Sequence, residues 1–271
     1  MPKFLCLPGY LQNGKMFAEK SSGLRKILTK KYSCQLDYVD PQVMIGAKEQ
    51  LPFQLSSDEV EASAKWNALV EQDVTRAWWK HQDPGNYEGF SHSFSYLKKY
   101  IQENGPYDGI IGFSQGAAMA AIICNSVVRE SMQDAPFKVA VFFSGFVFTE
   151  PIDPTQDKLA LTTDCKDIEE YIKLVQVVPG YEEYFTVTPE VQQSTKIINV
   201  FGSSDNAVPA IRSKQLTKIF RGDNAKSEGN ENDDQVIEFQ HDGGHFIPNK
   251  KQFLQPMVDV IVKELGSTSN L

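Results

Sequence analysis

Long apolar runs and an excess of basic residues are both missing from this chain of 271 residues. No apolar run approaches the roughly 20 residues that a membrane-spanning helix needs, and the start MPKFLCLPGYLQNGK has no signal-peptide cleavage pattern. We therefore expect a soluble, cytoplasmic protein without a membrane span. The chain has 27 Lys and Arg against 35 Asp and Glu, and its net charge of −8 disfavours nucleic acid as a partner.

Paired cysteines are missing as well. The four cysteines, Cys6, Cys34, Cys124 and Cys165, are spread along the chain without a C-x-x-C pair. This spacing argues against a disulfide framework and against a zinc site, so we expect reduced thiols and no metal. Cys6 lies in the apolar run FLCL and Cys124 in AAIIC, which predicts that both are small buried residues.

The pattern that is present is a repeated strand followed by a helix. Strands are predicted at 4–7, 34–40, 109–113, 138–146, 196–205 and 235–245, and helices at 15–31, 91–105, from 117 onward, 211–220 and 250–265. Such alternation indicates a mostly parallel sheet wound with helices on both faces, an α/β fold. At this length we expect a single domain over residues 1–271.

Three stretches do not fit the repeat. Two are predicted insertions, at about 41–90 and 149–195, and the third is a polar, acidic loop at about 222–235 that we expect to be flexible. The insertions carry the aromatic residues Trp66, Trp78, Trp79, Tyr87, Tyr171, Tyr181, Tyr184 and Phe185. Because strand-to-helix loops gather at the carboxyl edge of a parallel sheet, these aromatics either cap a substrate site or simply pack in the core.

The sequence GFSQG places Ser114 between a predicted buried strand and a predicted helix. A G-x-S-x-G pattern alone is weak evidence, but its flanks here are those of a nucleophile elbow. A strand that turns into a helix within about two residues needs neighbours without bulk. Gly112, Gly116 and the alanine-rich start of the helix supply that room, which predicts that Ser114 is an exposed nucleophile at the sheet edge.

A serine nucleophile needs a base within hydrogen-bond reach, and histidine is the usual one. His81 and His92 precede the elbow, whereas in a hydrolase with the chain order Ser, acid, His the base follows the last strand. That leaves His241 and His245. We favour His245 because DGGHFIP places it beyond two glycines in a loop, while His241 finishes the predicted strand.

The acid that orients the histidine should follow a strand between the elbow and the base. Asp205 in NVFGSSDNAVP does so, and Pro209 then stands where a helix would begin. Asp153, Asp164 and Asp167 lie in the second insertion with no strand so close before them, and we expect them to be surface charges.

An oxyanion hole needs two backbone N–H groups, one of them from the residue after the nucleophile. Gln115 would supply that one. The second would come from PGYLQNG after the first strand, where the amide of either Tyr10 or Leu11 is in position.

The four segments LCLPGYLQNG, GPYDGIIGFSQGAAMA, NVFGSSDNAVP and HDGGHFIPNK together resemble the fungal family of serine hydrolases called FSH, which are relatives of the human ovarian-cancer-associated serine hydrolase. The resemblance implies an α/β-hydrolase fold, a catalytic triad of Ser114, Asp205 and His245, no cofactor, and esterase or thioesterase activity on small acyl substrates. Pro8 stands where many members of the family have histidine.

The leading hypothesis from the sequence is therefore a serine carboxylesterase or thioesterase that works through an acyl-enzyme. A carbon–carbon bond hydrolase or a peptidase of the same fold is an alternative, and so is a binding protein that keeps the fold without catalysis. Covalent labelling with a serine-directed phosphonate separates the enzymes from the binding protein.

Overall fold

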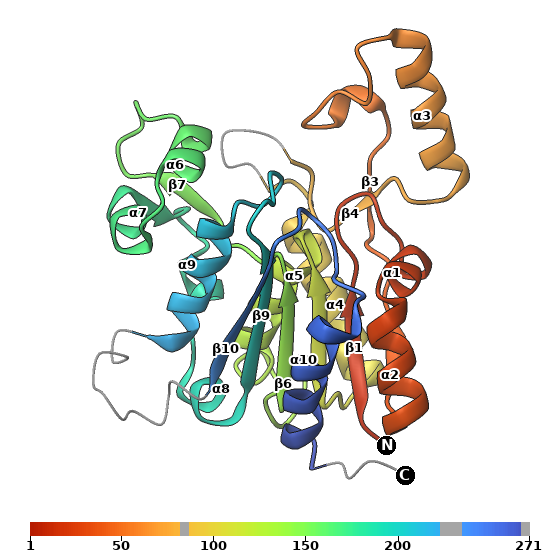
Figure 1. Ribbon diagram of the computed structural model, residues 1–271, viewed down its shortest axis with the longest axis vertical. Coiled ribbons are helices and arrows are strands. Elements are labelled where there is room, and N and C mark those ends of the chain that lie inside the picture. Colours follow the sequence, from red (N-terminus) through yellow and green to blue (C-terminus); the bar gives the residue numbers. More distant parts are fainter. Residues whose placement is uncertain (82–86, 223–234, 267–271) are drawn as a thin grey trace.

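A parallel sheet forms the centre of the molecule. The computed structural model describes residues 1–81, 87–222 and 235–266, and within them the main sheet has six strands in the order β10–β9–β6–β5–β1–β2 (Figure 1). The strands are β1 (Lys3–Leu7), β2 (Gln35–Tyr38), β5 (Gly109–Phe113), β6 (Val139–Phe143), β9 (Lys196–Gly202) and β10 (Val236–His241). All neighbouring strands pair in parallel, so their carboxyl ends meet at one edge.

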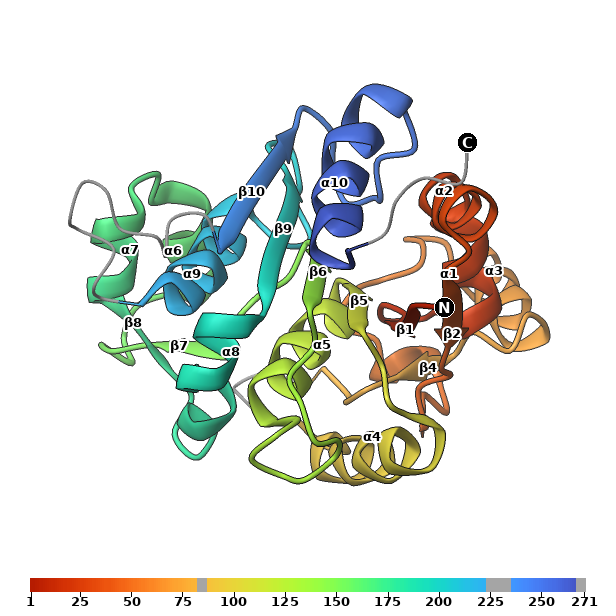
Figure 2. The same cartoon turned by 90° about the horizontal axis from the view of Figure 1, so that it is seen from below.

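Helices cover both faces of this sheet, as predicted (Figure 2). One face carries α1 (Gly14–Lys20), α2 (Ser22–Tyr32) and α10 (Lys251–Glu264), and the other carries α4 (Phe90–Asn104), α5 (Gln115–Ser126) and α9 (Ala210–Arg221). Alternate strand residues enter the two apolar layers, because successive side chains of a strand point to opposite faces. Ile110 belongs to the layer under α4 and α5, and its neighbour Ile111 belongs to the layer under α2 and α10.

The local sequence explains the elements that surround the elbow. Every residue of β5 and of β6 is buried, as expected for central strands of a sheet covered on both faces. Helix α4 buries Phe90, Phe94, Leu97 and Ile101, which recur at helical spacing on one face. Burial of such a side chain contributes about 1.5–3 kcal/mol. Helix α5 is buried along its whole length, and its alanines let it lie close to the sheet.

The predicted helix at 15–31 is two helices, and this difference has a local cause. The chain breaks at Ser21, whose hydroxyl and N–H both donate to the carbonyl of Phe17. The Asn249 side chain then bridges the break, since it donates to the Lys20 carbonyl and accepts from the Gly23 N–H. Polar groups freed at the junction are thus satisfied by a residue from the other end of the chain.

The two segments predicted as insertions add no strand to the six-stranded sheet within the described residues. The first contains β3 (Val43–Met44), the 3₁₀ helix η1 (Lys48–Gln50), α3 (Glu59–Glu71) and β4 (Arg76–Ala77). The second contains β7 (Thr149–Pro151), α6 (Lys158–Asp164), α7 (Ile168–Leu174), β8 (Val175–Val177), the 3₁₀ helix η2 (Glu182–Phe185) and α8 (Pro189–Ser194). Helix α3 stands away from the sheet and its covering helices in Figure 1.

Some of the aromatic residues of the insertions form one packed cluster, namely Trp79, Tyr87, Tyr181, Tyr184 and Phe185. Trp78, Trp79, Tyr171 and Phe185 are buried, whereas Trp66, Tyr87, Tyr181 and Tyr184 are partly exposed. Phe148 lies at the centre of a cluster that joins the two insertions: its ring centroid is 3.9 Å from that of Tyr87, stacked, and 4.8 Å from that of Trp79. Core packing therefore accounts for the buried aromatics.

Three further expectations concern thiols, membrane spans and the acidic loop. Cys6, Cys34 and Cys124 are buried, Cys165 is partly exposed, and all four are free thiols. Burial raises the pKa of the Cys124 thiol to about 12. Among the residues described, no helix is both long enough and apolar enough to cross a bilayer. The predicted flexible loop at 222–235 lies, except at its two ends, outside the described residues.

Candidate active site

Ser114 stands at the turn between β5 and α5 in a conformation that L-residues rarely adopt, with φ 55° and ψ −119°. The turn is tight because two glycines allow backbone to touch backbone. A Cβ on Gly112 would lie 2.3 Å from the Gly116 carbonyl oxygen, and a Cβ on Gly116 would lie 2.2 Å from that of Leu7. Any side chain at either position would push the strand and the helix apart, and Ser114 would lose its place.

Ser114, His245 and Asp205 form one chain of hydrogen bonds. The His245 Nε2 atom is 2.9 Å from Ser114 Oγ, and its Nδ1 atom is 2.8 Å from Asp205 Oδ2. With the ring proton on Nδ1, the imidazole donates to the carboxylate and accepts from the serine hydroxyl. The three residues follow β5, β9 and β10, whose carboxyl ends lie at the same edge of the sheet.

The Asp205 side chain is fully buried and completely bonded. Its Oδ1 accepts the N–H groups of Ala207, at 3.0 Å, and Val208, at 2.8 Å. Its Oδ2 accepts the Ser144 hydroxyl, at 2.9 Å, in addition to His245. Burial alone raises the pKa of Asp205, but the hydrogen bonds from His245, Val208 and Ser144 and the charge of His245 outweigh it and hold the pKa below its usual value of 3.8.

Ser144 is a member of this site that the sequence analysis did not find. It follows β6 directly, in the apolar stretch VAVFFSGF, where nothing distinguishes it from the end of a buried strand. Its contact is with a carboxylate 61 positions away in the chain.

The alternative histidine and acids have other partners. His241 is buried, and its Nδ1 accepts the Gly243 N–H at 3.2 Å. Burial lowers the pKa of His241. Asp167 caps the start of α7, and Asp153 accepts the hydroxyl and N–H of Thr155, so both act locally. His92 and Asp164 are exposed, and the His81 ring lies edge-on to Tyr10 with the ring centroids 5.2 Å apart.

The structure distinguishes between the two early-loop N–H groups, of Tyr10 and Leu11, that the sequence offered as the second oxyanion donor. The Leu11 N–H donates to the Arg76 carbonyl at 2.9 Å, so Leu11 is not available as an oxyanion donor, and its φ of 54° lies in the left-handed region. The N–H groups of Tyr10 and Gln115 have no hydrogen-bond partner in the described part of the chain. The loop touches the elbow, since a Cβ on Gly9 would lie 3.3 Å from that of Ser114.

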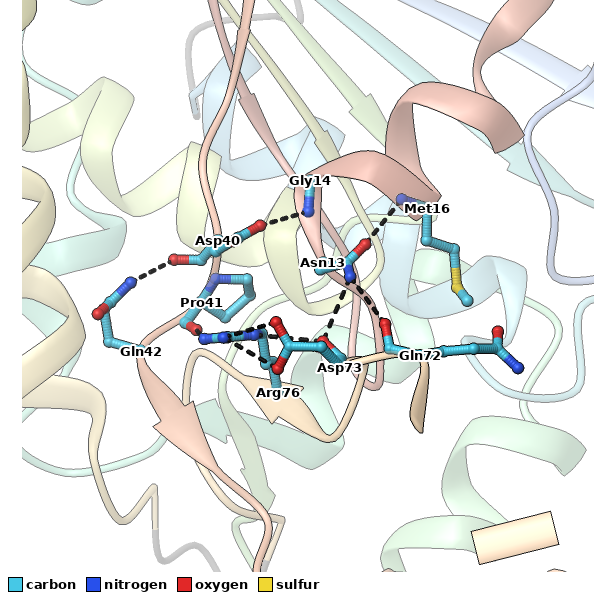
Figure 3. A network of polar contacts seen from close by, with 9 residues as sticks. All are labelled: Asn13, Gly14, Met16, Asp40, Pro41, Gln42, Gln72, Asp73 and Arg76. Carbon is cyan, nitrogen blue, oxygen red and sulfur yellow. Dashed lines mark hydrogen bonds and ion pairs between the residues drawn. The ribbon is translucent and has the colours of Figure 1, made fainter. Parts of the chain in front are cut away.

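A polar network fixes this loop to the first insertion (Figure 3). Asn13 caps α1 through the Met16 N–H and donates to the carbonyls of Gln72 and Asp73. The Arg76 guanidinium bonds both carboxylate oxygens of Asp73 and the Pro41 carbonyl. Arg76 therefore holds Leu11 through its backbone and the insertion through its side chain, which fixes the residue that follows Tyr10.

The Gln115 side chain performs a similar task on the other side of Ser114. Its Oε1 accepts the Trp78 N–H at 2.7 Å, and its Nε2 donates to the Trp79 carbonyl at 2.8 Å. The remaining polar groups of Trp78 bond the Pro8 carbonyl and the Ser93 hydroxyl. The elbow, the early loop and α4 are thus all bonded to Trp78 and Trp79 of the first insertion.

A family model covers most of the chain. The family model described as serine hydrolase (FSH1) matches residues 1–257. The chain belongs to this family. Membership of the FSH1 family makes it a serine hydrolase.

Curated relatives of this FSH1-family hydrolase include two that match nearly its whole length. Esterase OVCA2 of Danio rerio is 26% identical over 269 residues, which cover 96% of this chain and 96% of that protein. Family of serine hydrolases 3 of Saccharomyces cerevisiae is 27% identical over 272 residues, which cover 96% of this chain and 83% of the yeast protein.

Solved structures confirm the α/β-hydrolase fold. The crystal structure of Zea mays acyl-protein thioesterase 2 superimposes with a TM-score of 0.56 and 15% sequence identity, covering 98% of this chain and 94% of the plant protein. At 15% identity this similarity is evidence for the fold alone.

Replacement of Gln115 by Met is expected to lower both stability and activity. Two buried backbone groups, the Trp78 N–H and the Trp79 carbonyl, would lose their partners, at about 1–3 kcal/mol each. Trp78 and Trp79 would then shift against the elbow, so kcat should fall as well. Denaturant unfolding and ester turnover measure the two effects.

Gln133→Met is the matched control, because the Gln133 side chain likewise accepts a backbone N–H and donates to a backbone carbonyl, both of Tyr107. Tyr107 precedes β5 and lies at the opposite edge of the sheet from the site. It should lose some stability and keep its kcat. If Gln115→Met were as stable as the wild type, the side chain would not be holding the insertion.

The contribution of Asp205 to stability should depend on pH. A carboxyl whose pKa is lower in the folded than in the unfolded chain stabilises the fold fully above the unfolded value, near 3.9, and this stabilisation is lost as the pH falls through the folded value. The difference in free energy of unfolding between wild type and Asp205→Asn should therefore shrink between pH 5 and pH 2.5. A difference that grew on acidification would contradict the lowered pKa.

Proposed function

We propose that this protein hydrolyses small acyl esters or thioesters through an acyl-enzyme, with Ser114 as nucleophile, His245 as general base and Asp205 as the acid that orients His245. The observation that carries the proposal is the continuous chain Ser114 Oγ–His245 Nε2 and His245 Nδ1–Asp205 Oδ2, at 2.9 and 2.8 Å. Both distances are those of good hydrogen bonds. The family's name and the esterase names of its relatives support hydrolysis of an ester.

The first half of the reaction transfers the acyl group to Ser114. As the Ser114 oxygen attacks the carbonyl carbon of the substrate, its proton moves to His245 Nε2. The carbonyl oxygen becomes an oxyanion, for which the proposed donors are the N–H groups of Gln115 and Tyr10, which have no partner among the described residues. When the tetrahedral intermediate collapses, the alcohol or thiol leaves with the proton that His245 returns.

The second half releases the acid. Water enters in place of the leaving group, gives one proton to His245, and attacks the acyl carbon. Collapse of the second intermediate frees the carboxylic acid and returns the proton to Ser114. Asp205 stays ionised throughout, because its buried carboxylate accepts four hydrogen bonds, and it stabilises the imidazolium that forms in each half.

The domain organisation of the chain is part of the same proposal. We treat residues 1–271 as one domain in which the two insertions cap the site. The bonds of Gln115 to Trp78 and Trp79 support this, because they attach the first insertion beside Ser114.

A panel of p-nitrophenyl esters and acyl thioesters of graded chain length tests the proposal. We expect turnover of at least one of the two series, with a burst of the first product equal to the enzyme concentration when deacylation is slow. Hydrolysis of peptides, or of carbon–carbon bonds, with no ester turnover would favour the alternatives of the same fold. No turnover and no covalent adduct would indicate a binding protein.

A further inference from the structure

The hydroxyl of Ser144 bonds the same carboxylate oxygen that His245 uses. Ser144 Oγ lies 2.9 Å from Asp205 Oδ2, and His245 Nδ1 lies 2.8 Å from it. Ser144 is 1% exposed and the Asp205 side chain is fully buried, so water does not compete for this bond. A hydrogen bond to a buried charge is among the strongest that a neutral side chain makes.

The two oxygens of Asp205 are held from opposite sides. Two backbone N–H groups, of Ala207 and Val208, fix Oδ1. On Oδ2, the Ser144 hydroxyl is the other donor besides His245 within the described residues. Without it, the imidazole would be the one donor left on Oδ2 within the described residues, and Oδ2 would be held less tightly, because the rotational preference of the terminal bond is broad.

The backbone of Ser144 is held in an unusual conformation to make this contact. Its φ is 50°, a region that residues other than glycine seldom occupy, and its N–H donates to the Val200 carbonyl of β9 at 2.8 Å. Ser114 has the same sign of φ after the neighbouring strand β5. Such outliers persist where the surroundings fix them, and they gather at functional sites.

We propose that Ser144 is a positioning residue for the reaction: its hydroxyl holds Asp205 Oδ2 in line with His245 Nδ1. The inference rests on the proposed function of the Ser114, His245 and Asp205 chain. The four residues follow β5, β6, β9 and β10, which are four neighbouring strands of the sheet, so each strand end supplies one member of the site.

Loss of the hydroxyl has a defined electrostatic sign. The donated hydrogen bond disperses part of the charge on Oδ2. When it is removed, the pKa of Asp205 rises, so the carboxyl takes up a proton at a higher pH and then no longer accepts the bond from His245. The loss of activity on acidification should therefore begin at a higher pH. The other imidazole on which the Asp205 charge acts is that of His241, which is not bonded to the carboxylate and is the same in all variants.

Two variants separate the hydroxyl from the backbone strain. Ser144→Ala removes the hydroxyl and keeps a Cβ at positive φ, whereas Ser144→Gly removes both and relieves the strain. Ser213→Ala is the matched control: Ser213 is fully buried and its hydroxyl donates to the Gly145 carbonyl at 2.7 Å, next to Ser144 but away from the carboxylate. Each variant is assayed for kcat, KM, the pH profile of kcat/KM, melting temperature, and the rate of labelling by a fluorophosphonate.

We expect both Ser144 variants to lose about 10- to 100-fold in kcat with little change in KM, and to label correspondingly slowly. Their pH profiles should shift upward, and the glycine variant should regain stability without regaining kcat. Ser213→Ala should lose stability alone. Normal labelling and kcat in both Ser144 variants, with a labelled wild type, would overturn this inference and leave the proposed function standing. A wild type that does not label would overturn both.

Discussion

Ser114→Ala is expected to lower kcat for ester hydrolysis by about 10⁴-fold or more and to abolish covalent labelling by fluorophosphonates. The only atom removed is the oxygen that lies 2.9 Å from His245 Nε2, so the attack and the proton transfer are both lost. The fold should survive, because the main-chain bonds of Ser114 do not involve its side chain. The Ser114 N–H donates to the Phe143 carbonyl, and the Ser114 carbonyl accepts the Ala117 N–H.

The control for this experiment is Ser203→Ala, which removes an exposed hydroxyl two residues before Asp205. It should turn over esters and label like the wild type. Mass spectrometry of the labelled wild type should place the adduct on the peptide that contains Ser114. Labelling of Ser114→Ala at the wild-type rate would show that another residue is the nucleophile.

The second large effect is expected from Asp205→Asn. The amide keeps the size and shape of the side chain, but whichever way it is turned it cannot accept bonds at both oxygen positions. The buried amide then conflicts with Ser144 and His245, or with the N–H groups of Ala207 and Val208. The imidazole would lose the partner that fixes its tautomer and stabilises its charged form. We expect kcat to fall by about 10⁴-fold with only a small change in KM.

Asp242→Asn is the matched control, because Asp242 is exposed and lies in the loop that leads to His245. It removes the same charge from the neighbourhood without touching the imidazole, so its kcat should stay within a few-fold of the wild type. A near-normal kcat in Asp205→Asn would show that Asp205 does not orient His245. An equal loss of kcat in both variants would also contradict this role, because it would indicate a general effect of negative charge near the site.

The sequence predicted the parts of the site that depend on local patterns. The elbow could be recognised because a strand, two glycines and an alanine-rich helix are adjacent in the chain around Ser114. Asp205 and His245 could be placed because each follows a strand, and parallel strands bring their carboxyl ends to one edge. None of these inferences needed a contact to be known in advance.

The parts that escaped prediction depend on contacts between distant segments. Ser144 looks like the end of a buried strand until its partner 61 residues away is known. The break between α1 and α2 is stabilised by Asn249, which is 226 residues from Gly23. The role of Leu11 depended on whether its N–H points toward the elbow or toward Arg76, and in the structure it bonds the Arg76 carbonyl. A single sequence carries no local signal for any of them.

The order of the strands along the chain also determines when, during synthesis, the proposed triad can first assemble. A ribosome makes Ser114, Ser144 and Asp205 well before β10, which pairs with β9 from Val236 beside Ile197 to His241 beside Gly202. Until that last strand docks, His245 has no fixed position relative to Ser114, and the serine hydroxyl remains as unreactive as any other alcohol. Under the proposed mechanism the nascent chain is therefore inert toward acyl compounds, and hydrolysis begins only when the edge strand β10 is in place.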